Sequence, residues 1–214
     1  MTIPQTNADE FANALETHAP RYGVELSAQA RLQLRRYYEH VSAWNPRLHL
    51  VAPCSAAEFA TRHVLESLLA LPFLTAGARV ADVGSGAGLP IIPCLILRPD
   101  VRATLIEANA RKSVFLREAL RLLGLDGTSK VIAGRFETMQ TIQVDFVTCR
   151  ALDRFTEMFS KLLDWSPHSS RLLLFGGPTL EAELKRHALD YTALHIPASE
   201  QRFLFVVGRV PSDS

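Results

Sequence analysis

The chain has 214 residues, of which 48% are hydrophobic, and its formal net charge is +1. This composition excludes a disordered protein, and the near-zero charge provides no overall basic field for nucleic acid, although it is compatible with a local basic patch. Three scattered cysteines without Cys-x-x-Cys spacing argue against a disulfide framework and against a zinc site.

The first part of the chain is predicted to be helical. Ser27 precedes a run whose apolar residues recur at helical spacing, so we expect it to cap a helix. Pro46 and Pro53 are expected to break this pattern and to form a loop. Residues 55–58, Ser-Ala-Ala-Glu, have the spacing of a capping box and open a third helix.

From residue 79 the pattern changes to alternating strands and helices. Helical stretches separate five short apolar runs: RVADV, RATLIEA, KVIAG, VDFVTC and RLLLF. This alternation predicts an α/β fold with a mostly parallel sheet and helices on both faces. Two more extended runs, YTALHIPA and QRFLFVVGRV, predict an antiparallel closing pair. We therefore divide the chain into an N-terminal helical extension, residues 1–75, packed on an α/β domain, residues 76–214.

A glycine-rich loop follows the first predicted strand in the sequence RVADVGSGAGLPIIP. Gly84, Gly86 and Gly88 form the pattern GxGxG at the carboxyl end of the strand, where ligands bind in doubly wound sheets. The third glycine of the dinucleotide pattern GxGxxG would fall on Leu89, whose bulk disfavours NAD. Asp82 before this loop suits S-adenosylmethionine, which has no phosphates. The alternative interpretation is a tight turn without a ligand.

Two further segments supply candidate walls for a nucleoside. Glu107 ends the second predicted strand, where a carboxylate can accept hydrogen bonds from both ribose hydroxyls. Phe136 and Glu137 follow the third strand and are candidates for contact with an adenine ring. Alternatively, Glu107 is a solvated strand end, and the other two residues cap the next segment. The glycine loop and Glu107 together favour a nucleoside cofactor.

Several segments resemble a known enzyme family in their order and spacing. They are WNPRLHLVAP, TRHVLESLLALP, RVADVGSGAGLPIIP, LRPDVRATLIEANARKSVFLREAL and RALDRF. Over residues 20–210 the chain resembles the RsmG (GidB) family, most specifically in Arg-His at residues 62–63 and Gly-Leu-Pro at residues 88–90. The resemblance implies a class I, Rossmann-like methyltransferase. It also implies methyl transfer from S-adenosylmethionine to N7 of a guanine in 16S rRNA.

The resemblance also implies the partner of the chain. The substrate would be 16S rRNA or the small ribosomal subunit as an assembly intermediate, and we expect a monomer. The beginning of the sequence lacks the charged head and apolar core of a secretory signal, and no apolar run could cross a bilayer. We therefore expect a cytoplasmic protein that contacts no membrane and holds no metal ion.

The glycine loop and the resemblance together define a candidate cofactor site. Its residues are Asp82, Gly84, Ser85, Gly86, Gly88, Leu89, Glu107, Phe136, Glu137 and Arg150. Glu107 stands where the family usually has aspartate. The family's Lys-Arg pair reads Arg111-Lys112 here, and Gly176 occupies the position of a family lysine. The loss of that lysine weakens the expected anchoring of phosphate.

Arg150 ends the fourth predicted strand, directed toward the glycine loop, and is the candidate catalytic residue. Guanine N7 carries a free lone pair, so its methylation releases no proton and requires no general base. Catalysis would come from holding N7 in line with the methyl group, and Arg150 or Arg111 could donate to guanine O6. Alternatively, Arg150 forms an ion pair at the rim. Cys149 is expected to be a buried thiol rather than a nucleophile.

The candidate substrate-binding residues surround the same end of the sheet. They are Arg62, His63, Arg111, Lys112 and Arg202. His63 could instead be a packing residue, and Arg202 could form a salt bridge at the rim. Two other functions stay open: a methyltransferase on the same fold that acts on another RNA site or on a small molecule, and a non-catalytic nucleoside-binding protein. The intact glycine loop argues against the last of these.

Overall fold

The computed structural model describes residues 5–150 and 155–208. The predicted RALDRF segment therefore lies partly outside the described residues, at positions 151–154. The first part of the chain is helical, as expected. Its elements are α1 (Gln5–His18), η1 (Ala19–Tyr22), α2 (Ala28–Leu48), α3 (Ala56–Glu58), the π-helical segment η2 (Phe59–Leu65), α4 (Glu66–Leu68) and η3 (Leu71–Phe73).

A seven-stranded sheet in the order β3-β2-β1-β4-β5-β7-β6 follows. Its strands are β1 (Arg79–Val83), β2 (Arg102–Glu107), β3 (Lys130–Ala133), β4 (Phe146–Arg150), β5 (Arg171–Gly176), β6 (Tyr191–His195) and β7 (Phe203–Val207). The first five strands pair in parallel, whereas β7 is antiparallel to β5 and β6. The predicted α/β fold with an antiparallel last strand is therefore confirmed.

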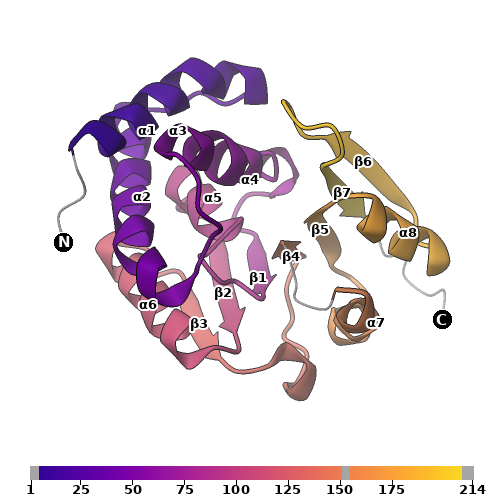
Figure 1. Ribbon diagram of the computed structural model, residues 1–214. Helices are drawn as coiled ribbons and strands as arrows, with labels where there is room; N and C mark the ends of the chain where they lie inside the picture. Colours follow the sequence, from indigo (N-terminus) through magenta and orange to yellow (C-terminus); the bar gives the residue numbers. More distant parts are fainter. Residues whose placement is uncertain (1–4, 151–154, 209–214) are drawn as a thin grey trace.

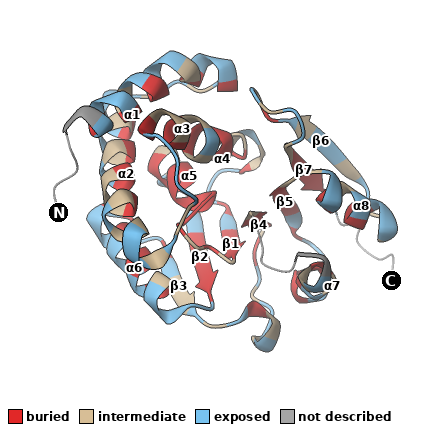
Figure 2. Cartoon of the chain, in the orientation of Figure 1, coloured by how far each residue is buried: buried red, intermediate tan, exposed pale blue. Residues whose placement is uncertain are grey.

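Helices cover both faces of this sheet. After the first strand they are α5 (Ile91–Leu97), α6 (Ala110–Leu122), η4 (Phe136–Thr138), α7 (Phe155–Trp165) and α8 (Pro178–Arg186). Because successive strand residues point to opposite faces, Val80 belongs to the core that includes residues of α2, α5 and α6, while Ala81 belongs to the core that includes residues of α7 and α8. Figure 1 shows the two helical layers, and Figure 2 shows their buried sides turned toward the strands. The N-terminal helices thus share a core with one face of the sheet.

Helix α2 is longer than predicted because it passes through Pro46 and ends at Leu48. Proline removes one helical hydrogen bond, but Trp44 and Leu48 on either side of it pack against the core. The helix then stops at His49, which adopts a left-handed conformation with φ of 48° and donates its N–H to the Asn45 carbonyl at 2.9 Å. The expected break is therefore wrong by one turn, because apolar burial outweighs the lost hydrogen bond.

The two predicted helix caps are present. Ser27 Oγ accepts from the Ala30 N–H at 3.1 Å, and Ser55 Oγ accepts from the Glu58 N–H at 3.0 Å. The third helix, expected to be regular, becomes π-helical over Phe59–Leu65. Such wide turns are rare and occur frequently at functional sites. No helix within the described ranges is long and apolar enough to span a membrane.

Candidate active site at the carboxyl ends of the strands

A cavity of about 560 Å³ lies beyond the carboxyl ends of β1, β2 and β4. The chain order reverses here, since β1 is flanked by β2 on one side and β4 on the other. The walls come from the glycine loop, the end of β2, the turn after β3, the loop at residues 49–52, and single residues of η2, α6, β4 and α7. Most of the predicted site residues therefore meet in one cavity.

The glycine loop requires its glycines for two different reasons. Gly84, Gly86 and Gly88 all have positive φ, at 68°, 56° and 87°. A Cβ on Gly86 would meet only the Gly84 carbonyl, at 3.7 Å, so this part of the loop leaves space for a ligand. A Cβ on Gly88 would overlap Ile92 of α5 and lie 3.3 Å from Leu116 of α6. Gly88 does not line the cavity, and it allows the loop to pack closely on these two helices.

Asp82 holds the loop from beneath and does not line the cavity. Its buried carboxylate accepts hydrogen bonds from Ser85 Oγ at 2.5 Å and from Thr148 Oγ1 at 2.6 Å. Burial raises the pKa of Asp82 to about 7, although these two hydroxyls oppose the shift. Buried Tyr37 of α2 also fixes the loop, because its hydroxyl donates to the Ala87 carbonyl at 2.8 Å.

Glu107 joins the loop to the end of β2. Its Oε2 accepts from the Gly86 N–H at 2.9 Å, and its Oε1 accepts from the Asn109 N–H at 2.7 Å. The carboxylate lines the cavity, and each oxygen has a second lone pair for a further donor. This arrangement suits a pair of ribose hydroxyls.

Phe136 and Glu137 form the part of the cavity wall that follows β3. The Phe136 ring packs edge-on against Trp165, with centroids 5.9 Å apart, and lines the cavity. Glu137 accepts a hydrogen bond from Arg135 Nε at 2.8 Å. Burial acts to raise the pKa of Glu137, but the Arg135 hydrogen bond and a backbone hydrogen bond leave that pKa lowered. The wall thus offers an aromatic side chain and an ionised carboxylate to a planar ring.

Arg150 lies at the end of β4, on the opposite side of the cavity from α6. Its Nη2 donates to Glu66 Oε2 at 3.1 Å and to the Arg62 carbonyl at 2.6 Å. Arg202 Nη1 lies 2.6 Å from the other Glu66 oxygen, as an ion pair. The Glu66 side chain is only 1% exposed. Arg150 Nη1 is buried and has no hydrogen-bond partner among the described residues, so it is available to an acceptor in the cavity.

His63 lines the cavity next to Arg150. Its ring packs near Phe59, with centroids 5.1 Å apart, and its buried Nδ1 has no partner in the described part of the chain. Burial and the charges of Arg150, Arg62 and Arg202 lower the pKa of His63 to about 3. The imidazole is therefore neutral near pH 7, which suits hydrogen bonding rather than proton transfer.

The other predicted substrate residues separate into three groups. Lys112 lines the cavity, whereas Arg111 is exposed on α6 and does not. Arg62 pairs with Glu58 and, with Arg202, lines a second cavity. A side chain on Gly176 would collide with Leu180, whose Cδ2 would lie 2.6 Å from the added Cβ. Position 176 therefore cannot take a lysine without a shift of α8.

Sequence reasoning missed two functional features. Glu66, which fixes Arg150, stands among apolar residues one helical turn after Arg62, and a lone acid in such a run was the available signal. Asn45 clamps the loop at residues 49–52, because its side chain both accepts from the Val51 N–H and donates to the Val51 carbonyl, at 2.9 and 3.1 Å. No local pattern indicated that this loop faces the glycines.

Comparisons with known proteins place the chain in a family. A family model described as GidB, rRNA small subunit methyltransferase G, matches residues 30–205. A relative from Neisseria gonorrhoeae (strain NCCP11945), called ribosomal RNA small subunit methyltransferase G, is 37% identical over 155 residues, which are 72% of this chain and 71% of that protein.

Solved structures support the same fold. The mitomycin 7-O-methyltransferase MmcR is 17% identical with a TM-score of 0.60, and the match covers 96% of this chain and 69% of that one. A SAM-dependent methyltransferase from Aquifex aeolicus is 16% identical with a TM-score of 0.50, over 63% of this chain and 84% of that one. The sheet is therefore that of the class I methyltransferases, and the chain belongs to the GidB family of rRNA small subunit methyltransferases.

Proposed function

We propose that this protein transfers the methyl group of S-adenosylmethionine to N7 of a guanine in 16S rRNA of the small ribosomal subunit. The observation that carries the proposal is the family match over residues 30–205, which includes every residue that lines the cavity. The relatives are named ribosomal RNA small subunit methyltransferase G, a name that gives small-subunit rRNA as the substrate of those proteins. The choice of guanine N7 rests on the family resemblance and on the chemistry of the cavity.

The residues present fit the proposed cofactor. Gly86 leaves open space above the main chain, and Glu107 keeps free lone pairs for ribose hydroxyls. Phe136 and Glu137 would contact the adenine ring, while Gly84, Ser85 and Leu89 line the cavity beside them. Asp82 and Gly88 would act beneath the surface, by shaping the loop. When bound, the cofactor supplies an electrophilic methyl group on a sulfonium.

The wall around Arg150 and His63 would hold the target base. Arg150 Nη1 lacks a partner among the described residues and can donate to guanine O6, which would orient N7 toward the glycine loop. Neutral His63 offers a second hydrogen-bonding group beside it, and Lys112 adds positive charge at the rim. N7 methylation releases no proton, so this wall needs to position the base and exclude water rather than accept a proton.

A methyltransferase for another RNA site or for a small molecule is the second candidate. It is motivated by Gly176 in the position of a family lysine and by the formal net charge of +1. Methyl transfer to 30S particles and to protein-free 16S rRNA, followed by mapping of the modified base, distinguishes the two. We expect a guanine at which the RNA chain is cleaved after borohydride reduction and aniline treatment, as N7-methylguanine requires; a methylated pyrimidine or exocyclic amine would refute the N7 mechanism.

Calorimetry tests the cofactor site directly. We expect S-adenosylmethionine and its demethylated product to bind and NAD not to bind. Gly86→Val should abolish binding, because its side chain would fill the space above the loop. Gly127→Val is the matched control, since that glycine also faces open space but lies outside the cavity. Equal loss of affinity in both variants, or no binding to the wild type, would refute the assignment.

We propose that residues 76–214 form the methyltransferase domain and that residues 1–75 extend it and complete the substrate wall through His63 and Glu66. The shared core between the N-terminal helices and the sheet supports this division of labour. We further propose that the protein works as a monomer in the cytoplasm, where its rRNA substrate is assembled.

A further inference from the structure

A second cavity, of about 280 Å³, lies between the N-terminal helices and the loop that joins β6 to β7. It is lined by His18, Arg21, Tyr22, Thr61, Arg62, Glu66, Pro197, Ala198 and Arg202. Figure 1 shows the β6–β7 loop reaching toward the helices at the top of the molecule. Residues from the two ends of the chain thus build one hollow.

The two sides of this cavity are tied together. The Tyr22 hydroxyl donates a hydrogen bond to the Pro197 carbonyl at 3.2 Å, across 175 positions of sequence. The next residue, Ala198, adopts a left-handed conformation with φ of 59°. A non-glycine residue in this conformation is uncommon and costs free energy, so the loop geometry is held by its surroundings. The cavity is therefore a formed feature rather than a gap between independent parts.

Positive charge dominates the cavity and its inner wall. The guanidinium groups of Arg21, Arg62, Arg150 and Arg202 surround two carboxylates: Glu66, which pairs with Arg150 and Arg202, and Glu58, which pairs with Arg62. His18 adds a further basic group at the edge. Arg21 is exposed and has no ion pair or side-chain hydrogen bond in the described part of the chain. An anion could therefore bind without displacing an existing partner of Arg21.

Arg202 is already oriented for such an anion. Its Nε donates to Ser199 Oγ at 3.2 Å, and its Nη1 pairs with buried Glu66 at 2.6 Å. Its side chain nevertheless keeps 31% of its surface exposed. An arginine fixed in this way loses little side-chain entropy when it binds a phosphate, and its planar group suits phosphate oxygens.

The second cavity adjoins the methyl-transfer cavity through the π-helical segment. Arg62 faces the second cavity, and the next residue, His63, faces the first. Glu66 pairs with Arg202 on one side and Arg150 on the other. A strand whose base enters the first cavity would therefore run past the second within a short distance along its backbone.

We propose that the second cavity binds a backbone phosphate of the RNA strand that presents the target base, with Arg21 and Arg202 as its main contacts. This inference rests on the proposed function, because it names a further contact with the same substrate. RNA-binding proteins gain much of their affinity from such phosphate contacts, which position the strand and carry no sequence information.

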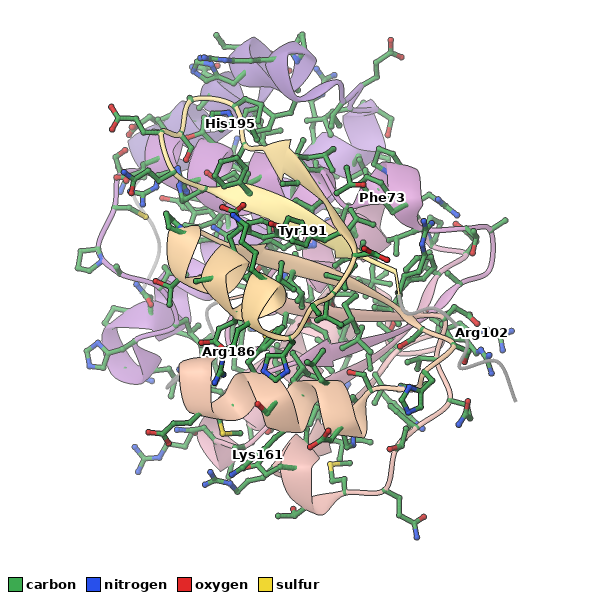
Figure 3. The ribbon with its side chains drawn as sticks, turned by 90° about the vertical axis from the view of Figure 1, so that its right-hand side faces the viewer. Phe73, Arg102, Lys161, Arg186, Tyr191 and His195 are labelled. Atoms are coloured by element: carbon green, nitrogen blue, oxygen red, sulfur yellow. The ribbon has the colours of Figure 1, made fainter. Side chains whose placement is uncertain are left out.

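The experiment compares Arg21→Gln with Arg102→Gln in the full-length protein. Arg102 is exposed and starts β2, at the amino ends of the parallel strands, whereas the β6–β7 loop lies at their carboxyl ends. Figure 3 shows Arg102 far from His195, which precedes that loop. Binding to 16S rRNA is measured over a series of KCl concentrations. We expect Arg21→Gln to weaken binding on the order of ten-fold and to lower the salt slope by about 0.7 to 1, the value for one phosphate contact.

The affinity for S-adenosylmethionine, measured by calorimetry, should be the same in the wild type, Arg21→Gln and Arg102→Gln, because Arg21 and Arg102 lie outside the first cavity. An Arg21→Gln slope and affinity equal to those of Arg102→Gln would overturn the proposal. So would saturable binding of inorganic phosphate that depends on Arg21 while RNA binding does not. If the wild-type protein binds RNA but transfers no methyl group to it, only the proposed function is refuted. The difference in salt slope between Arg21→Gln and Arg102→Gln still tests phosphate binding in the second cavity.

Discussion

The two walls of the main cavity are built in opposite ways. The glycine-loop wall is made of main chain, shaped by positive φ angles and held by hydrogen bonds through Asp82 and from Tyr37 and by close packing at Gly88. The opposite wall depends on charged side chains: Arg150 of β4 lines the cavity, while Glu66 at the start of α4 and Arg202 before β7 form the ion pairs behind it. The first wall depends on backbone conformation and on close packing at Gly88, whereas the second depends on the balance of buried charges. Substitutions in the first wall should therefore act through packing and backbone strain, and substitutions in the second wall through unpaired buried charge.

The largest effect is expected from Glu66→Gln. Removal of the carboxylate leaves two arginines close together, one of them deeply buried, without their shared counter-ion. Breaking a buried ion pair in this way costs about 3 to 5 kcal/mol in the free energy of unfolding. Urea denaturation measures the loss.

The matched control for that experiment is Glu58→Gln. Glu58 pairs with Arg62 on the surface of the same helical segment, so its removal should cost about 0.5 kcal/mol. Similar losses in the two variants would mean that the Glu66 cluster is solvated, and that the substrate wall does not depend on buried charge.

The next effect is expected from Gly88→Ala. Its methyl group would overlap Ile92 in a loop with φ of 87°, and we expect a loss of about 2 to 4 kcal/mol in unfolding free energy from overpacking and backbone strain. Gly86→Ala should cost only about 1 kcal/mol in the absence of ligand, since its methyl group meets nothing closer than 3.7 Å. Thermal denaturation of both variants shows which one loses more stability; a larger loss in Gly86→Ala than in Gly88→Ala would contradict the packing role of Gly88.

The fold could be predicted from sequence because its signals are local and periodic. The alternation of apolar strands and helices led to the parallel sheet, and the caps at Ser27 and Ser55 were found from side-chain type alone. The expected break at Pro46 failed because tertiary packing of Trp44 and Leu48 outweighed a local preference. The π-helical turns of η2 had no recognisable pattern.

Sequence spacing was enough to predict the glycine wall of the candidate site, and Arg150 and His63 of the opposite wall were also expected, but the buried carboxylate that holds Arg150 was not. Gly84, Gly86 and Glu107 lie within one β-loop-α-β stretch, so spacing was enough to bring them together. The opposite wall joins Glu66 to Arg150 and Arg202, which are 84 and 136 positions away. No single-sequence pattern carries such distant pairings, so Glu66 was overlooked although its two partners had been selected.

Arg150→Lys separates the geometry of the substrate wall from its charge. Lysine preserves the charge for Glu66 but cannot donate simultaneously to Glu66, to the Arg62 carbonyl and into the cavity as the guanidinium is placed to do. We expect kcat/KM for methyl transfer to 30S particles to fall about 10- to 100-fold. The Kd for S-adenosylmethionine should stay the same. Unchanged turnover would show that the base is oriented by another residue.

The smallest effect is expected from the pH dependence of His63→Gln. The pKa of His63 is about 3 in the folded protein and about 6.5 when unfolded. Its contribution to stability is therefore complete above pH 6.5 and is lost as the pH falls toward 3, because only the unfolded chain binds the proton. Asp82 acts in the opposite direction, since its folded pKa of about 7 lies above the unfolded value of 3.8 and acid favours the folded state.

The two groups thus give the free energy of unfolding opposite pH dependences between pH 6.5 and 3.8. Without His63, only the dependence that comes from Asp82 should be left. Relative to wild type, His63→Gln should gain about 1 to 2 kcal/mol of unfolding free energy when the pH is lowered from 7 to 5. Urea denaturation at the two pH values measures this difference, with exposed His168→Gln as the control. A gain no larger than that of the control would mean that His63 is accessible to protons in the folded protein, and that the substrate wall is wetter than its buried charges indicate.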